Sequence, residues 1–172
     1  NYPCVPRGED RPGRLDCPMA DIDDFYRSIR ETGGYTTPPG RLPARPPRGG
    51  FWSAWCFYVG GLGVVIAEGM RTLHAGRFSP ETLGRLSWRL MHAAERMGTA
   101  VTFEGFESMR GLDRQPAVIV ANHMSLAETM MLPAGVFANG PMIIVAKRSL
   151  TRDPAVGRIL EASRPILVDR RN

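Results

Sequence analysis

His123 and Glu128 are the residues of this chain whose types and spacing best suit acid–base chemistry. They follow an apolar run rich in β-branched residues and stand five positions apart. A carboxylate that accepts a hydrogen bond from one ring nitrogen holds a histidine in one tautomer, so the other nitrogen can take a proton from a hydroxyl. The pair would be the base and the orienting group of a catalytic triad that has no protein nucleophile.

The elements around this pair are predicted as a strand, a sharp turn and a helix. Residues 117–121 form the predicted buried strand. Asn122 and Ser125 shape the turn, and Ser125 caps a helix expected over about residues 126–137. His123 would then lie at the carboxyl end of a strand, where open α/β sheets bind their ligands. A hydrogen-bonded structural histidine remains the alternative.

Two further apolar runs predict neighbouring strands that end in basic residues. Residues 142–146 lead to Lys147 and Arg148, and residues 165–168 lead to Arg170. Because the carboxyl ends of parallel strands meet at one edge, these cations would surround a phosphate-bearing substrate. For each cation, a solvated strand end is the alternative. The order of elements predicts an α/β fold with a largely parallel open sheet flanked by helices.

A helix is predicted to begin at Ser79, which is followed by proline and an acid, and to end at Gly98. One of its faces is apolar. The opposite face carries a basic stripe, which is either solvated or in contact with anionic lipid or phosphate: Arg85, Arg89, His92 and Arg96.

Residues 51–67 carry no charge, and as a helix they would span about 25 Å. Tryptophan and tyrosine cluster near one end of this segment, as interfacial aromatics do. The sequence predicts a hydrophobic, membrane-associated helix within residues 51–75. A spanning helix, an in-plane helix and a soluble core helix all remain open.

Residues 1–50 hold nine of the fifteen prolines. This composition predicts a disordered, flexible tail rich in proline, glycine and arginine, which buries no core, with one short amphipathic helix over residues 19–31. The expected division is this tail, the hydrophobic segment 51–75, and an α/β domain over residues 76–172 that is truncated at its C-terminal side. The chain is expected to be a piece of a longer protein.

The net charge of +5 comes almost wholly from arginine. It fits anionic partners such as phosphates, CoA or acidic lipid headgroups. No nucleic-acid-binding module is recognisable, so no nucleic-acid partner is expected. The three cysteines have no metal-ligand spacing, so neither a metal site nor a disulfide framework is predicted.

Residues 51–172 resemble the glycerolipid acyltransferase family, most closely the 1-acylglycerol-3-phosphate acyltransferases. The segment from Asn122 to Glu128 resembles the family's first block, Asn-His-x4-Asp. Lys147 to Leu150, followed by Gly157, resembles the segment between its first and second blocks. Residues 166–170 resemble the end of the second block, whose arginine, Arg170 here, is implicated in binding the acceptor phosphate.

The resemblance implies transfer of a fatty acyl group from acyl-CoA or acyl carrier protein to a lysophospholipid hydroxyl, in phospholipid biosynthesis. The expected acceptor is 1-acylglycerol-3-phosphate (lysophosphatidic acid), and the product is phosphatidic acid. His123 would be the base, Glu128 its orienting group, and Arg170, Lys147 and Arg148 the phosphate ligands. No metal or further cofactor is implied. The protein is expected to be associated with a membrane, either at its surface or within the bilayer. The expected membrane is the bacterial inner membrane, with the catalytic domain facing the cytoplasm.

Three features depart from the family pattern. Glu128 replaces the first-block aspartate, Arg164 stands where glycine is common, and the third block, Glu-Gly-Thr-Arg, is absent. These departures predict that this fragment alone is inactive. They also keep a second hypothesis open, a degenerate or truncated family member that binds anionic membranes without catalysis. A hydrolase ranks lower because the chain lacks a Gly-x-Ser-x-Gly elbow.

Overall fold

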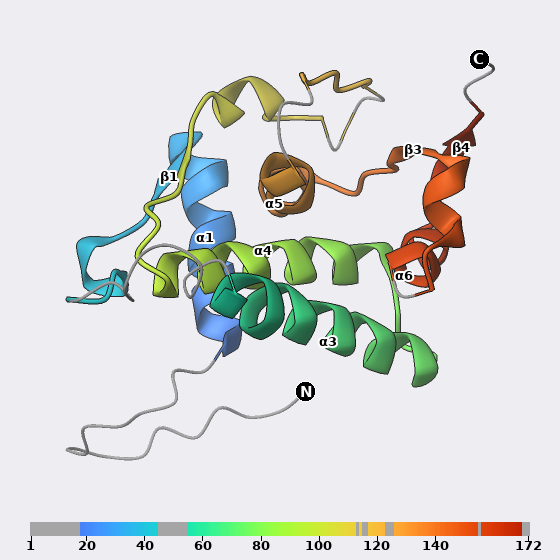
Figure 1. The fold of residues 1–172 in the computed structure, drawn as a ribbon. Coiled ribbons are helices and arrows are strands. Elements are labelled where there is room, and N and C mark those ends of the chain that lie inside the picture. The colour runs from blue at the N-terminus through green and yellow to red at the C-terminus, as the bar shows by residue number, and fades with distance from the viewer. Residues whose placement is uncertain are drawn as a thin grey trace.

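The computed structural model describes residues 18–44, 55–112, 114, 117–122, 126–154 and 156–169. Within these ranges, helices form most of the fold and the strands are short (Figure 1). The α-helices are α1 Pro18–Thr32, α3 Gly63–His74, α4 Pro80–Arg96, α5 Leu126–Asn139 and α6 Val156–Ala162. Shorter turns of helix are η1 Pro39–Arg41, η2 Cys56–Leu62, η3 Phe106–Met109 and η4 Arg148–Arg152. The strands are β1 Tyr35–Thr36, β2 Thr102–Phe103, β3 Val145–Lys147 and β4 Ile166–Val168.

Helix α4 is the central element, and its predicted start is confirmed. Ser79 is the N-cap, Pro80 fills the first helical position, and the Ser79 backbone N–H donates to Thr82 Oγ1 at 3.1 Å. In Figure 1, α3 runs alongside α4, and α5 is seen end-on above it. Helix α5 can lie this close because position 84 is glycine: a Cβ there would be 2.9 Å from Phe137 Cβ.

The main core lies between α1, α4, α5 and the β1–β2 pair. Its largest buried side chains include Phe25 and Ile29 from α1, and Trp88 and Met91 from α4. The predicted helix over residues 19–31 is therefore confirmed as α1. The prediction that residues 1–50 bury no core is wrong for residues 18–44, because one face of α1 is apolar at helical spacing and packs inward. The boundaries of the three expected segments stay predictions.

A second core joins α3, α4 and α6 through Val65, Leu86, Leu90 and Ile159. Gly69 makes the contact possible, because a Cβ there would be 2.7 Å from Ile159 Cδ1. Residues 56–74 form one continuous helix, η2 followed by α3. In the described part of the chain, this is the one helix long and apolar enough to cross a membrane, by length and composition alone.

The strands form two pairs. β1 and β2 are antiparallel, with Tyr35 opposite Phe103. β3 and β4 are parallel, with Val145 opposite Ile166 and Lys147 opposite Val168. The mixed helix–strand class and the parallel pairing of the last two predicted strands are confirmed. The described residues contain no large parallel open sheet.

The segment 117–122 differs from its prediction. It forms no strand, and the side chains of Val118 and Val120 are 90% and 88% exposed. A strand needs a hydrogen-bonded neighbour, and none of the described strands lies beside this segment. Its β-branched composition favours a strand, but no described strand pairs with it.

Helix α5 is also longer than predicted and reaches Asn139. Pro133 lies inside α5 without ending it. The cost of a missing N–H is offset by the burial of Ala134, Val136 and Phe137 in the contacts with neighbouring helices.

Candidate functional site

The predicted catalytic pair is only partly described. Glu128 lies in the first turn of α5 and is half-buried, so the predicted helix start is confirmed. Asn122 precedes it in an exposed segment. His123, Ser125 and Arg170 fall outside the described residues. The contact between His123 and Glu128, and the role of Arg170, therefore stay predictions.

Two of the three basic residues predicted at the carboxyl ends of the strands, Lys147 and Arg148, lie where the sequence put them. Lys147 is the last residue of β3, and Arg148 begins η4 directly after it. Since Lys147 pairs with Val168, the next residues along both strands, Arg148 and Asp169, come side by side. Arg148 Nε donates to Asp169 Oδ1 at 3.1 Å and to Oδ2 at 3.0 Å. Arg148 is thus ion-paired at an exposed strand end, and its predicted role in binding phosphate stays a prediction.

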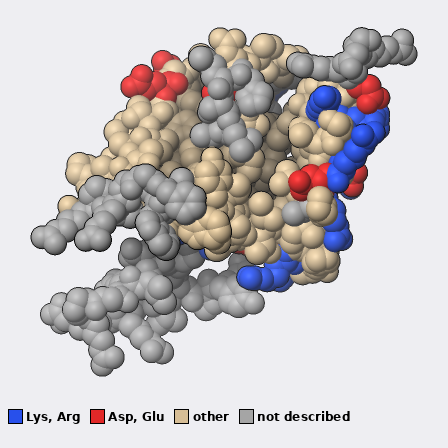
Figure 2. All heavy atoms as spheres, viewed as in Figure 1, with Lys and Arg blue, Asp and Glu red and all other residues tan. Residues whose placement is uncertain are grey.

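Further cations gather around this edge. In Figure 2, Lys and Arg side chains collect on the side of the molecule where Figure 1 places β3, β4 and α6. We call these exposed residues the basic patch: Lys147, Arg148, Arg152, Arg158 and Arg164. Figure 2 also shows carboxylates among them, and Asp153, Glu161 and Asp169 are the exposed acids of the same segment. Cations still outnumber acids here, which favours anionic substrates and surfaces.

Arg164 occupies a backbone position that suits glycine. Its φ is 53°, the one positive φ among the described non-glycine residues. A side chain in this left-handed region crowds the backbone, whereas glycine adopts it freely. The positive φ is a physical reason for glycine to be common at this position in the acyltransferase family that the sequence resembles.

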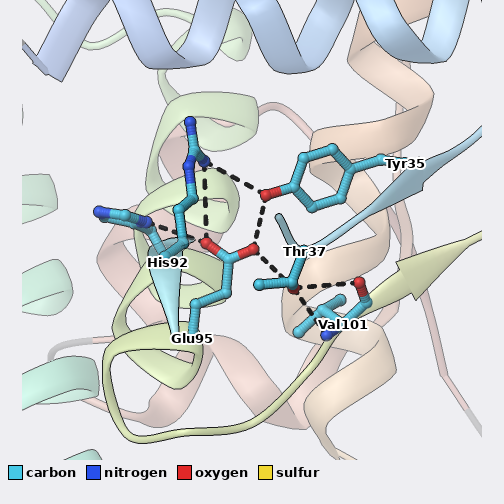
Figure 3. Close-up of polar contacts among 6 residues, drawn as sticks. Tyr35, Thr37, His92, Glu95 and Val101 are labelled. Carbon is cyan, nitrogen blue, oxygen red and sulfur yellow. Dashed lines mark hydrogen bonds and ion pairs between the residues drawn. The ribbon is translucent and has the colours of Figure 1, made fainter. Parts of the chain in front are cut away.

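The most complete polar cluster surrounds Glu95 of α4 and includes His92, one residue of the predicted basic stripe (Figure 3). The Glu95 side chain is 0% exposed. Tyr35 Oη donates to Glu95 Oε1 at 2.6 Å, and Thr37 Oγ1 donates to the same oxygen at 2.8 Å. His92 Nδ1 lies 3.0 Å from Glu95 Oε2, and Arg41 Nη1 lies 3.8 Å from it.

The titration of this cluster follows from its geometry. Burial raises the pKa of Glu95, but the hydrogen bonds from its partners, His92 first, outweigh burial and bring that pKa below its usual value. Burial raises the pKa of Tyr35 as well, and the hydrogen bond to Glu95 adds to the rise. A buried carboxylate with this many donors is ionised and fixed in place.

The Glu95 cluster joins segments that are distant in sequence. Thr37 also pairs with Val101, whose N–H donates to Thr37 Oγ1 at 2.8 Å. The His92 ring stacks on Trp88, with centroids 5.4 Å apart. Because Tyr35, Thr37 and Arg41 all contact Glu95, the cluster fixes residues 35–41 onto α4.

The cluster also corrects the interpretation of the basic stripe. His92 is held by Glu95, and Arg89 forms an ion pair with Glu68 of α3. Only Arg85 and Arg96 of the stripe are exposed. The sequence missed the cluster because a histidine and a glutamate three positions apart look like a surface pair, and the other donors lie about sixty residues away.

A cavity of about 600 Å³ lies elsewhere, at the C-terminal end of α5. It is lined by Arg30, Glu81, Arg110, Gly111, Phe137 and Pro141, among others. The α5 residues that line it begin nine positions after Glu128, at Phe137, so the cavity is about 15 Å from Glu128 along the helix. The cavity is therefore separate from Glu128. Among the described residues, no three His, Cys, Asp or Glu side chains are grouped so as to hold a metal ion.

Comparison with known proteins supports the resemblance seen in the sequence. Residues 100–172 match the model of the family described as Acyltransferase. No curated protein and no solved structure matches the chain. The matched residues include the segment from Asn122 to Glu128 and the segment from Lys147 to Arg170. Residues 100–172 are thus similar to part of an acyltransferase domain, which suggests acyl transfer in general.

Proposed function

We propose that the protein transfers a fatty acyl group from a thioester donor, acyl-CoA or acyl carrier protein, to the hydroxyl of a lysophospholipid. The acceptor we favour is 1-acylglycerol-3-phosphate, which gives phosphatidic acid. The observation that carries the proposal is the acyltransferase match over residues 100–172, because it includes both the histidine–carboxylate segment and the basic strand ends. The basic patch beside β3 supports an acceptor that carries a phosphate.

The proposed reaction has one proton transfer and one exchange of bonds. His123 accepts the proton of the acceptor hydroxyl while its oxygen attacks the thioester carbonyl carbon. The carbon–oxygen bond forms, the carbon–sulfur bond breaks, and the proton passes to the departing thiolate. Glu128 orients His123 and stabilises its imidazolium form. Arg170, Lys147 and Arg148 bind the acceptor phosphate, and the scheme needs no metal.

Glu128 bears directly on this scheme, because it is one methylene longer than the family's aspartate. A misplacement of about 1 Å can lower a rate about 100-fold. Activity with Glu128 therefore requires that α5 begin slightly further from His123 than an aspartate would need. Glu128→Asp is the direct test, and a large loss of kcat in that variant would support an adjusted geometry.

A labelled acyl-transfer assay tests the function. It uses the full-length protein, of which this chain is expected to be a piece, in detergent, with the two donor types and a panel of lysophospholipids with different headgroups. Transfer to lysophosphatidic acid supports the full proposal. Transfer only to another lysolipid keeps the reaction and changes the acceptor. No transfer from either donor, in a folded protein, contradicts the proposal.

We further propose that the helix over residues 56–74 lies in the plane of the membrane. One face of α3 is fixed to α4 and α6 through Val65 and Gly69, and Glu68 pairs with Arg89. A spanning α3 would draw the polar α4 into hydrocarbon, which is strongly unfavourable. The opposite side exposes Trp55, Tyr58, Val59 and Val64, which suit the boundary between headgroups and acyl chains.

The depth of a labelled side chain in the bilayer distinguishes a helix that lies in the plane of the membrane from one that spans it. A fluorophore on Val64→Cys, with the natural cysteines replaced by serine, would be quenched by shallow lipid probes if the helix lies in plane. Quenching near the bilayer centre would contradict the in-plane setting.

A non-catalytic membrane-binding protein is the second candidate, favoured by the same exposed aromatic and apolar side chains. It predicts salt-sensitive binding to anionic vesicles without any acyl transfer.

A further inference from the structure

The ion pair between Arg148 and Asp169 has a geometry that bears on phosphate binding. Both residues follow directly after the last paired positions of β3 and β4, so the parallel register fixes their separation. The Nε–H of Arg148 donates to both carboxylate oxygens of Asp169, with Nε 3.1 Å from Oδ1 and 3.0 Å from Oδ2. The two terminal nitrogens of Arg148 have no partner among the described residues.

Those terminal nitrogens form a planar fork of N–H donors that matches two oxygens of a phosphate. The Arg148 side chain is 58% exposed, so a ligand can reach it. A carboxylate on the Nε edge leaves the fork unblocked and limits the conformations of a long, flexible side chain. Arg148 is the one member of the basic patch with a carboxylate partner in the part of the chain that the structure describes.

We propose that Asp169 is a positioning residue, which holds Arg148 so that its terminal nitrogens face the phosphate of the acceptor. This inference rests on the proposed function and adds a residue to which neither composition nor motif assigned a role. A side chain already held in one geometry loses less conformational freedom on binding. Asp169 therefore favours binding of the phosphate without touching the reacting atoms.

The size of the effect follows from the exposure of the pair. Exposed ion pairs contribute modestly, and the loss of such a pair weakens binding by about threefold to fivefold. Asp169→Asn should raise KM for lysophosphatidic acid by that factor and leave kcat within about twofold. Asp169→Glu, which keeps the charge, should recover part of the loss.

Initial rates of the full chain test this with four variants: Asp169→Asn, Arg148→Gln, the double variant, and Glu161→Gln. Glu161 is exposed on α6 and has no described side-chain contact, so Glu161→Gln removes the same charge without touching Arg148. If Asp169 acts through Arg148, the double variant should have the same KM as Arg148→Gln alone. A merely structural pair would instead lower the unfolding midpoint and leave KM unchanged.

Several results would overturn the inference. If Asp169→Asn leaves KM unchanged, Asp169 has no role in binding the phosphate. If Glu161→Gln raises KM as much as Asp169→Asn does, the effect is one of general charge and is not specific to Asp169. A lowered KM would mean that Asp169 competes with the phosphate for Arg148. Binding of inorganic phosphate, followed through the Arg148 Nε–H signal by NMR, decides the question even if the wild type transfers no acyl group. In that case the proposed function fails, and weaker phosphate binding in Asp169→Asn still supports the positioning role.

Discussion

Glu95 is the residue whose titration should control the pH dependence of folding. Its pKa in the folded state lies below its value of 4.5 in an unfolded chain, so its stabilising effect is complete above about pH 4.5 and is lost as pH falls through the folded pKa. Glu95→Gln should lower the free energy of unfolding at pH 7 by about 2–3 kcal/mol, because charged hydrogen bonds are lost in a buried site. It should also flatten the acid side of the stability profile.

Urea unfolding between pH 3 and pH 7 measures both effects. Glu161→Gln, at an exposed position, is the matched control and should leave the profile unchanged. An unaltered acid side in Glu95→Gln would show that other carboxylates govern acid unfolding.

Arg164 should gain stability when it is replaced by glycine. Its φ of 53° costs an L-residue about 1–2 kcal/mol, and glycine's greater freedom in the unfolded chain offsets part of the gain. Arg164→Gly should therefore stabilise the protein by about 0.5–1 kcal/mol. Arg164→Gln, which removes the charge but keeps the Cβ, should have no such effect, and equal stabilisation in both variants would point to charge instead.

The residues of the candidate site could be predicted to different degrees. Glu128 and Lys147 lie on the elements that the sequence predicted, because helix caps and strand ends are local signals. Asp169 was visible as a strand-end residue, but its contact with Arg148 depends on the register of two strands. Glu95 could not be found, because its donors come from a different part of the chain.

Among the elements, the close contact of α4 with α5 rests on Gly84. A Cβ at this position would lie 2.9 Å from both Cβ and Cγ of Phe137, so one helix must shift. Gly84→Ala should destabilise the protein by about 1–3 kcal/mol despite the better helix propensity of alanine. Chemical denaturation measures the change. Gly60→Ala is the control, since nothing lies within 4 Å of its added Cβ. A neutral Gly84→Ala would mean that the helices separate easily.

The helices were predicted well and the sheet was not, for a physical reason. A helix satisfies its own backbone hydrogen bonds, so spacing and caps are sufficient to predict α1, α4 and α5. A strand needs hydrogen bonds to a neighbouring strand, and the local sequence does not show which segment that neighbour will be. This is why β3 and β4 pair as expected, while the equally β-branched residues 117–121 form no strand among the described residues.

At the scale of the whole molecule, the described part of the segment predicted as a tail, residues 18–44, contributes to the core. Phe25 is 1% exposed and packs against the rings of Tyr35 and Phe103. Phe25→Ala should destabilise the protein by about 3–5 kcal/mol, as large truncations in cores do. Thermal or chemical unfolding measures this, with Tyr58→Ala, at an exposed position, as the control. If α1 were only a linker, Phe25→Ala would be neutral, and that result would contradict the described core.

The central claim is that His123 is the base for acyl transfer to a phosphate-bearing lysolipid. Its most direct test is kcat for transfer to lysophosphatidic acid, compared between wild type, His123→Ala and His74→Ala, where His74 is an exposed residue of α3. Loss of a general base should lower kcat in His123→Ala by at least about 100-fold, with vesicle binding unchanged and His74→Ala fully active. Full activity in His123→Ala would contradict the mechanism.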